Sequence, residues 1–252
     1  MSKLRNAGLA FAAMLLSSAA LAAPAFAQAK NVVLVHGALV DGSGWRGVYD
    51  ILKRDGYTVS VVQQPLTGLD QDVAATKRVL ERQDGDTVLV GHSYGGTIIT
   101  AAGDDPKVKA LVYVAALQPE KGETTAGLVG SMPSPTSDIK PTPDGFLFLD
   151  PAKFPADFGA DLPKEQAEFM AQSQMPVAVS AFQAPVPVAS WHDKPSYGIV
   201  AKDDMTLNPD LQRSMYKRAG AKVTEIEGSH ALYISQAEAV AKVIEEAAQA
   251  AK

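Results

Sequence analysis

Ser93 is the residue whose setting most clearly suggests chemistry, because it stands between two glycines in the stretch GHSYG, residues 91–95. The apolar run VLV precedes this stretch, and helix-forming residues follow it. In a tight strand-to-helix turn such a serine adopts strained backbone angles, and the flanking glycines let neighbouring backbone approach closely. Its hydroxyl would project at the positive end of the next helix, where a developing oxyanion is stabilised. We therefore interpret Ser93 as a nucleophile rather than as a turn residue that happens to carry a hydroxyl.

A serine nucleophile requires a base, and the chain has four histidines. His230 lies in the stretch EGSH between the last predicted strand and the last predicted helix, so it belongs to the carboxyl edge of a parallel sheet, where Ser93 also emerges. We predict that His230 is the base; the alternative is a capping or packing histidine. Of the others, His36 would position the loop after the first strand, and His92 would point away from the neighbouring Ser93. His192 is expected at the surface or at a hinge.

Two further groups complete the predicted site. An acid must hold the imidazole in the right tautomer, and Asp203 and Asp204 both follow the strand-like run YGIVAK. Strand geometry does not choose between these neighbours, and the other one could be a solvated loop carboxylate. An oxyanion hole would use the backbone N–H of Tyr94, after the nucleophile, and that of Ala38, in the loop after the first strand.

Alternating elements must position these residues. Strand-like runs lie at 32–35, 57–62, 87–90, 109–115, 197–201 and 221–226, and helix-like stretches lie at 45–54, 72–82, 95–103, 209–219 and 235–250. Apolar strands that alternate with helices predict an α/β fold with a mostly parallel sheet covered on both faces.

The alternation is interrupted between about residues 118 and 195. This stretch holds 12 of the 16 prolines, which argues against further central strands because proline lacks the N–H that a sheet requires. Phenylalanine and tryptophan residues are interspersed, and the best helical stretch is 164–173. We predict an inserted, irregular cap, or lid, at about 118–195 that packs on the sheet through its aromatic residues. A partly disordered loop is the alternative.

Residues 1–27 predict a secretory signal peptide. Lys3 and Arg5 precede an apolar stretch at 7–16, and the small-residue pattern AFA at 25–27 places the cleavage after Ala27. The alternative, a transmembrane anchor, is disfavoured because serines and a proline interrupt the apolar stretch, whereas a spanning helix needs about 20 predominantly apolar residues. We expect the domain at 28–252 to be exported by a bacterium, to the periplasm or the medium, and to have no membrane attachment after cleavage.

Composition excludes several classes of function. The chain has no cysteine, so it has no disulfide, no thiolate metal site and no cysteine nucleophile, and a single domain must depend on its packed core. A formal net charge of −5 and the absence of basic runs argue against nucleic acid and anionic lipid as partners. The acids and histidines lack metal-site spacing, and no phosphate loop is present, so we expect no metal or other cofactor. The expected partner is a small-molecule ester, and the protein is expected to be a monomer or homodimer.

Five stretches together resemble a known family: LVHGALVDGSGW, VLVGHSYGGT, KALVYVAAL, IVAKDDMTLNPDLQ and EGSHALYISQAEAVAKVI. They are similar to the α/β-hydrolase superfamily, in particular to small bacterial esterases, plant methyl esterases and hydroxynitrile lyases. The resemblance covers about residues 31–252 and is weakest at 118–190. It implies the α/β-hydrolase fold, in which the order Ser, Asp, His is the usual one. Aligning DMTLNP on the family pattern favours Asp204 over Asp203, and the resemblance supports Ala38 and Tyr94 as the oxyanion hole.

Two departures from the hydroxynitrile lyases affect the expected activity. Those enzymes have a lysine after the triad histidine and a threonine after the first-strand histidine, whereas this chain has Ala231 and Gly37. We therefore predict a serine carboxylesterase for small apolar or aromatic substrates. The alternatives are lyase-like cleavage, lactone or amide cleavage, a haloperoxidase side activity, and a non-catalytic ligand-binding protein.

Overall fold

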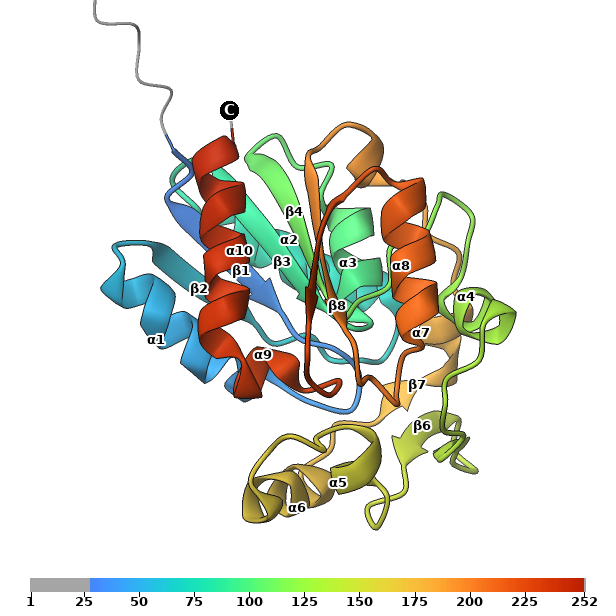
Figure 1. Ribbon diagram of the computed structural model, residues 1–252. Helices are drawn as coiled ribbons and strands as arrows, with labels where there is room; N and C mark the ends of the chain where they lie inside the picture. Colours follow the sequence, from blue (N-terminus) through green and yellow to red (C-terminus); the bar gives the residue numbers. More distant parts are fainter. Residues whose placement is uncertain (1–27, 252) are drawn as a thin grey trace, which may run out of the picture.

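The computed structural model describes residues 28–251 and is built around one central sheet (Figure 1). The predicted signal peptide at 1–27 lies outside the described residues. Six strands form the sheet in the order β2-β1-β3-β4-β8-β9, and every neighbouring pair is parallel. The strands are β1 (Asn31–Val35), β2 (Thr58–Val62), β3 (Thr87–His92), β4 (Val108–Val114), β8 (Ser196–Ala201) and β9 (Lys222–Ile226). The predicted parallel sheet is confirmed.

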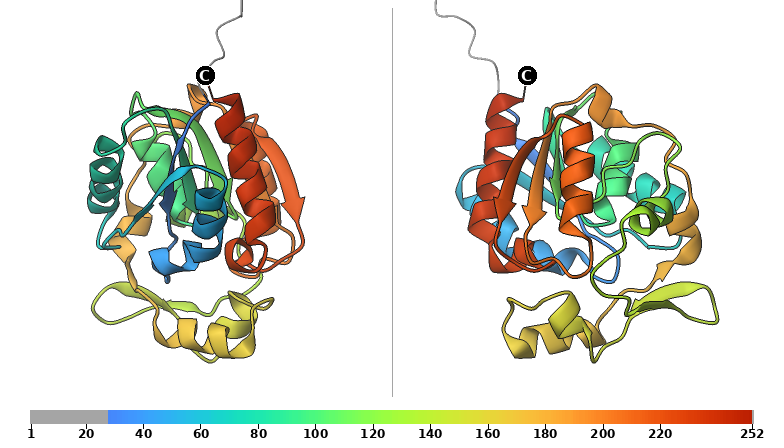
Figure 2. Two further views of the ribbon diagram at one scale, coloured as in Figure 1. Left: turned by 90° about the vertical axis from the view of Figure 1, so that its left-hand side faces the viewer. Right: turned by 45° about the vertical axis from the view of Figure 1, so that its right-hand side comes forward.

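Helices cover both faces of this sheet (Figure 2). One face carries a short 3-10 helix, η1 (Gly42–Trp45), together with α1 (Arg46–Arg54), α9 (Leu232–Ser235) and α10 (Ala237–Ala250). The other face carries α2 (Leu69–Glu81), α3 (Gly95–Ala102) and α8 (Pro209–Arg218). Alternate residues of the strands belong to two separate apolar cores, one on each face of the sheet. Val33 and Leu89 pack toward α2 and α3, and Val32 and Val88 pack toward α1 and α10. The fold is the α/β-hydrolase fold.

Residues 118–195 connect two neighbouring strands of the sheet, β4 and β8. They form α4 (Thr125–Ser131), α5 (Phe154–Asp157), α6 (Lys164–Gln172), α7 (Val179–Gln183) and the 3-10 helix η2 (Ser190–His192). They also form a small antiparallel sheet of β5 (Ile139–Pro141), β6 (Phe146–Leu149) and β7 (Val177–Ala178). Figure 1 shows α5, α6 and β6 beyond the end of the central sheet at which its strands finish.

This 118–195 segment differs from its sequence prediction in one respect. None of its strands joins the central sheet, as the prolines indicated, but the segment is more regular than predicted because only α6 was expected. Its aromatic side chains range from fully buried, as for Phe154 and Phe158, to exposed, as for Phe169 at 71%. Across residues 28–251, no helix is both long enough and apolar enough to cross a membrane.

Candidate active site

Ser93 lies at the sharp turn between β3 and α3, with the strained backbone angle φ = 53°. Hydrogen bonds hold the turn against β4 and the residues that follow it. The Ser93 N–H donates to the Val114 carbonyl, at the end of β4, over 3.2 Å. The Ser93 carbonyl accepts from the N–H groups of Gly96 (2.9 Å) and Leu117 (3.1 Å). A non-glycine residue persists in this conformation only where its surroundings fix it, and such positions cluster at functional sites.

The two glycines of the motif are required by close approach of backbone. A Cβ on Gly91 would lie 2.5 Å from the Gly95 carbonyl oxygen, and a Cβ on Gly95 would lie 2.7 Å from the His36 carbonyl oxygen. Both distances are shorter than a real Cβ contact, so no side chain fits at either position. The spacing of the motif therefore follows from how tightly β1, β3 and α3 converge around Ser93.

His230 and Asp204 form a buried hydrogen-bonded pair at the carboxyl edge of the sheet. The Nδ1 of His230 lies 2.7 Å from the Oδ2 of Asp204, and their side chains are 1% and 0% exposed. If Nδ1–H donates to this carboxylate, Nε2 carries the lone pair, and Nε2 has no hydrogen-bond partner among the described residues. The imidazole is therefore held in the tautomer that a general base needs.

Asp204 is fixed by three other donors, one of which is a side chain that the sequence did not single out. Its Oδ1 accepts from the N–H groups of Thr206 (2.8 Å) and Leu207 (2.7 Å). Its Oδ2 also accepts from the Nε2 of Gln212 on α8, over 2.9 Å, and Gln212 is fully buried. A glutamine on the inner face of an otherwise apolar helix stripe was the only sequence signal for this contact. Asp203 is exposed and instead accepts from the Gly228 N–H over 3.1 Å.

Two further histidines lie buried near the site and are neutral at pH 7. Burial lowers the pKa of His36 to about 4, and its Nδ1 lies 2.8 Å from the Gly37 carbonyl. Burial, with His230 nearby, holds the pKa of His92 well below its usual value. The Nε2–H of His92 donates to the His230 carbonyl over 2.9 Å, so His92 supports the loop rather than facing Ser93. Because both rings stay neutral, neither opposes a positive charge on His230 by repulsion.

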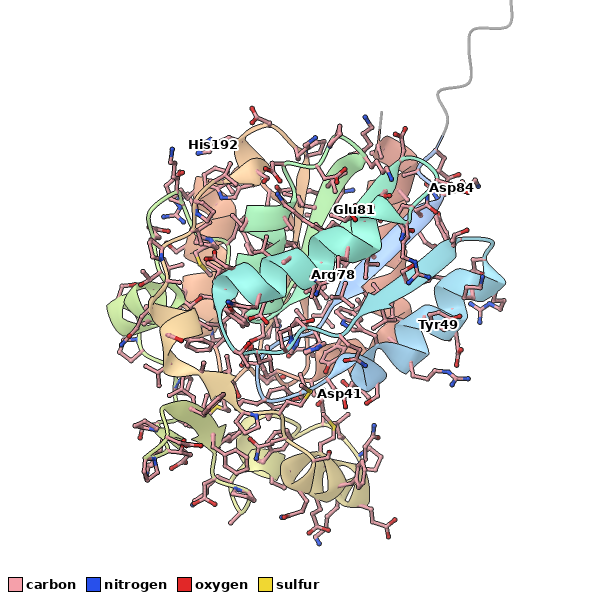
Figure 3. The ribbon with its side chains drawn as sticks, turned by 180° about the vertical axis from the view of Figure 1, so that it is seen from behind. Asp41, Tyr49, Arg78, Glu81, Asp84 and His192 are labelled. Carbon is pink, nitrogen blue, oxygen red and sulfur yellow. The ribbon has the colours of Figure 1, made fainter. Side chains whose placement is uncertain are left out.

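His192, the fourth histidine, is an exposed residue. Its Nε2 lies 2.8 Å from the Glu120 carboxylate, and its ring stacks on Trp191 with the ring centres 3.9 Å apart. Figure 3 shows it at the end of the molecule opposite α6 and β6. It takes no part in the site.

The two predicted oxyanion donors flank Ser93. Within residues 28–251, we find no hydrogen-bond acceptor for the N–H of Ala38 or for that of Tyr94. Ala38 borders the same cavity as Ser93, and Tyr94 begins the turn into α3. The next residue after Ala38, Leu39, has the positive angle φ = 68° and donates its N–H to the Met175 carbonyl. The loop that carries Ala38 is thus tied to the 118–195 segment.

Tyr94 is also held through its side chain, by a carboxyl that the sequence did not single out. Its hydroxyl donates to the Oδ2 of Asp72 over 3.0 Å, and both side chains are fully buried. The Oδ1 of Asp72 accepts from the Leu66 N–H over 2.8 Å. Burial raises the pKa of the Asp72 carboxyl to about 6.

A cavity of about 470 Å³ opens between the sheet edge and the 118–195 segment. Ala38, Ser93 and His230 border it on the sheet side, and its remaining wall is mostly apolar. The apolar wall includes Leu39, Leu117, Val129, Ile139, Leu147, Phe158, Val177, Phe182 and Leu207. Four hydroxyl side chains interrupt it, and none of its described lining residues is an acid, a lysine or an arginine. Its size and lining are those of a small-molecule site.

Of the predicted site residues, Ala38, Ser93 and His230 therefore border one cavity, and Asp204 reaches it through its hydrogen bond to His230. Ser93 and His230 border the same space, but no hydrogen bond joins the Ser93 hydroxyl to Nε2 in the part of the chain described. Catalytic hydrogen bonds are often long in ligand-free enzymes and shorten when substrate binds. No cluster of three or more metal-ligating side chains occurs among residues 28–251.

Comparison with known proteins identifies related enzymes. A pyrethroid hydrolase of Sphingobium wenxiniae is 27% identical over 253 residues, which covers 87% of this chain and 88% of the relative. Methylesterase 8 of Arabidopsis thaliana is 26% identical over 230 residues, which covers 79% and 82%. The crystal structure of a pyrethroid hydrolase from Sphingobium faniae matches with a TM-score of 0.77 and 26% identity over 88% of this chain and 98% of that one.

A model of the alpha/beta hydrolase family matches residues 32–243, which include the Ser93 turn, both acids and His230. The predicted resemblance is confirmed, and the chain belongs to the alpha/beta hydrolase family.

Proposed function

We propose that this hydrolase cleaves carboxylic esters with small apolar or aromatic groups by a Ser93–His230–Asp204 acyl-enzyme mechanism. The protein is a carboxylesterase-type hydrolase, as its family and relatives indicate. The observation that carries the proposed mechanism is the buried Asp204–His230 pair: its Nε2 has no hydrogen-bond partner among the described residues, and His230 borders the same cavity as Ser93.

In this mechanism the Ser93 Oγ attacks the ester carbonyl while Nε2 of His230 takes its proton. The carbonyl oxygen becomes an oxyanion, which the Ala38 and Tyr94 N–H groups stabilise by hydrogen bonds. His230, now an imidazolium held by Asp204, gives the proton to the departing alcohol oxygen, which leaves an acyl group on Ser93. A water molecule then repeats the sequence on the acyl carbonyl, and its attack releases the acid and regenerates the serine.

The cavity supports the substrate class. Its mostly apolar wall favours alkyl or aryl groups, since their burial contributes about 25 cal/mol per Å² of area removed from water. None of the described lining side chains is a lysine or an arginine, so a substrate carboxylate would lose its hydration without gaining an ion pair. Neutral esters should therefore be hydrolysed faster than the corresponding half-esters of dicarboxylic acids.

The test is covalent labelling and turnover of the Ser93→Ala variant. Wild-type protein should react with a fluorophosphonate probe and hydrolyse p-nitrophenyl butyrate, whereas Ser93→Ala should do neither. The residual turnover should be lower by at least about a thousandfold. Ser173→Ala, at an exposed serine of the 118–195 segment, is the matched control and should behave as wild type. Labelling that persists in Ser93→Ala, or a wild type that is never labelled, would contradict the proposal; the second outcome would favour a binding protein.

A further inference from the structure

The stretch from Phe154 to Asp161 belongs to the 118–195 segment, yet it is bonded to both loops that carry the proposed acid and base. On the acid side, the Thr206 hydroxyl donates to the Asp157 carbonyl over 2.8 Å. Thr206 also donates its N–H to the Oδ1 of Asp204. Thr206 therefore links the Asp204 carboxylate directly to α5.

On the base side, the same stretch binds the backbone on either side of His230. The Ala231 N–H, which follows His230, donates to the Phe158 carbonyl over 2.9 Å. The Ser229 N–H, which precedes it, donates to the Oδ2 of Asp161 over 3.0 Å. Ser229 also places its hydroxyl within hydrogen-bond distance of both the Asp161 Oδ1 and the Phe158 carbonyl.

The carboxylate of Asp161 has three donors although its residue is exposed at the surface. The third is the Ser235 hydroxyl, at the end of α9, which lies 2.6 Å from Oδ2. Burial raises the pKa of this carboxyl, but the hydrogen bonds from Ser229 and Ser235 outweigh that effect and hold its pKa below the usual value. At neutral pH it is therefore ionised, and hydrogen bonds to a charged acceptor are stronger than neutral ones.

A ring contact completes the attachment. The Phe158 ring meets the His230 ring edge to face, with the ring centres 4.8 Å apart and the planes at 84°. Phe158 is fully buried and stacks in turn on Phe154, with centres 4.7 Å apart. Because Nδ1 of His230 is bonded to Asp204, the remaining freedom of the ring depends on how its backbone and its face are held.

We propose that Asp161 is a positioning residue for His230: through Ser229 it fixes the backbone that sets how far Nε2 lies from the Ser93 hydroxyl. This inference rests on the proposed function, because it assigns the carboxylate a role in that reaction. Misplacement of a reacting group by about 1 Å can lower the rate a hundredfold. The 118–195 segment thus has two roles at the site, since it lines the cavity and also holds the base.

The alternative is that Asp161 only anchors the segment to the sheet domain, and substrates of two sizes separate these roles. p-Nitrophenyl acetate has a short acyl group, whereas p-nitrophenyl hexanoate extends against more of the cavity wall. If Asp161 positions His230, Asp161→Asn should lower kcat for both esters about tenfold to a hundredfold, with KM within about twofold of wild type. If it only anchors the segment, KM for the hexanoate should rise while kcat for the acetate stays unchanged.

Further variants make the test specific. Ser229→Ala removes the hydroxyl bond to Asp161 but keeps the Ser229 N–H, so it should lower kcat in the same direction. Adding it to Asp161→Asn should cost less than the sum of the two single losses, because both changes weaken the same contact. Ser235→Ala removes a different donor from the same carboxylate and should keep wild-type kcat. Circular dichroism and the melting temperature of each variant show that it is folded, and Asp161→Glu, which retains the charge, should recover part of kcat.

Three outcomes would overturn the inference. They are unchanged kcat in folded Asp161→Asn, a loss that appears only in KM, and an equal loss in Ser235→Ala. A wild type that neither hydrolyses these esters nor reacts with a fluorophosphonate would overturn the proposed function and this inference together. An active wild type with an unaffected Asp161→Asn would overturn the inference alone.

Discussion

The carboxylates of Asp203 and Asp204 have different partners although the residues are neighbours in the sequence. Asp204 is buried and bonded to His230, whereas Asp203 is exposed and bonded to the Gly228 N–H. Asp204→Asn should lower kcat by about 10⁴-fold, because an amide no longer stabilises the imidazolium and favours the wrong tautomer. Asp203→Asn should change kcat by less than about tenfold. Steady-state kinetics on one p-nitrophenyl ester compares the two, and equal losses would contradict the assigned roles.

Asp72 gives a second prediction at the level of one residue. Its pKa of about 6 in the folded protein lies above that of an unfolded chain, about 3.9. The folded state thus binds the proton more tightly, so this group's contribution to stability is present below about pH 4 and is lost as the pH rises to about 6. Asp72→Asn cannot ionise and should lose less stability over that interval.

Urea unfolding at pH 4.5 and pH 7 measures this difference. The matched control is Asp70→Asn, at an exposed acid of the same helix, which should follow the wild type. The same change in unfolding free energy with pH in wild type and Asp72→Asn would refute the prediction.

The backbone around Ser93 is crowded because β1, β3 and α3 converge there. A methyl group at Gly95 would meet the backbone oxygens of Val35 and His36 at 2.7 Å, and backbone cannot move aside as a flexible side chain can. Gly95→Ala should therefore lower the unfolding free energy by about 1–3 kcal/mol. Gly130 in α4 is exposed, and a methyl group there would have no atom within 4 Å. Gly130→Ala should stabilise the protein by about 0.5–1 kcal/mol.

Thermal unfolding followed by circular dichroism distinguishes these two glycines. Opposite shifts of the melting temperature are expected, and a Gly95→Ala protein as stable as wild type would show that the crowding can relax.

Elements also explain which parts of the fold the sequence could predict. The strands and helices outside 118–195 that were predicted are mostly five to fourteen residues long, so their apolar period is visible, and their predicted positions agree with the structure to within a few residues. Inside that segment, β7 has two residues and α5 has four, which is too short for any period to be recognised. The prolines correctly excluded central strands but did not reveal the small antiparallel sheet.

The candidate site likewise contains residues that the sequence could predict and residues that it could not. Ser93 and His230 could be predicted as site residues because each follows a recognisable strand and lies in a loop with its own sequence pattern. Gln212 could not be predicted, because a glutamine on a helix carries no pattern that marks it as a partner of Asp204. Asp161 could not be predicted either, because its contact with Ser229 joins residues 68 apart in the sequence. Nor could strand geometry choose Asp204 over its neighbour, since that depends on which carboxylate turns inward.

One of the two apolar cores of the molecule is shared between the sheet and the 118–195 segment. Residues of β1 and α3 belong to the same buried cluster as Phe154, Phe158 and Trp191. The two tryptophans lie in different cores and can test whether both cores unfold together. Trp45 is buried on the α1 side of the sheet, and Trp191 lies in the segment, where its indole N–H donates to the Pro119 carbonyl over 2.7 Å.

Cooperative unfolding is the expected result. Each single-tryptophan variant, Trp191→Phe or Trp45→Phe, reports on the tryptophan that remains. In both variants the fluorescence should change at the same urea concentration as the far-ultraviolet circular dichroism. A Trp191 transition at lower urea than the circular dichroism transition would mean that the segment unfolds before the sheet.

The hydrogen bond from the Leu117 N–H to the Ser93 carbonyl has a consequence for how this enzyme could be re-engineered or could diverge. The chain up to residue 117 holds the backbone of Ser93, so variants with different substrate preferences should all keep this part unchanged. A graft of a foreign specificity segment should begin beyond this residue and retain the stretch from Phe154 to Asp161. New substrate preferences are then free to arise in the remainder, chiefly in α4, the small antiparallel sheet and α7.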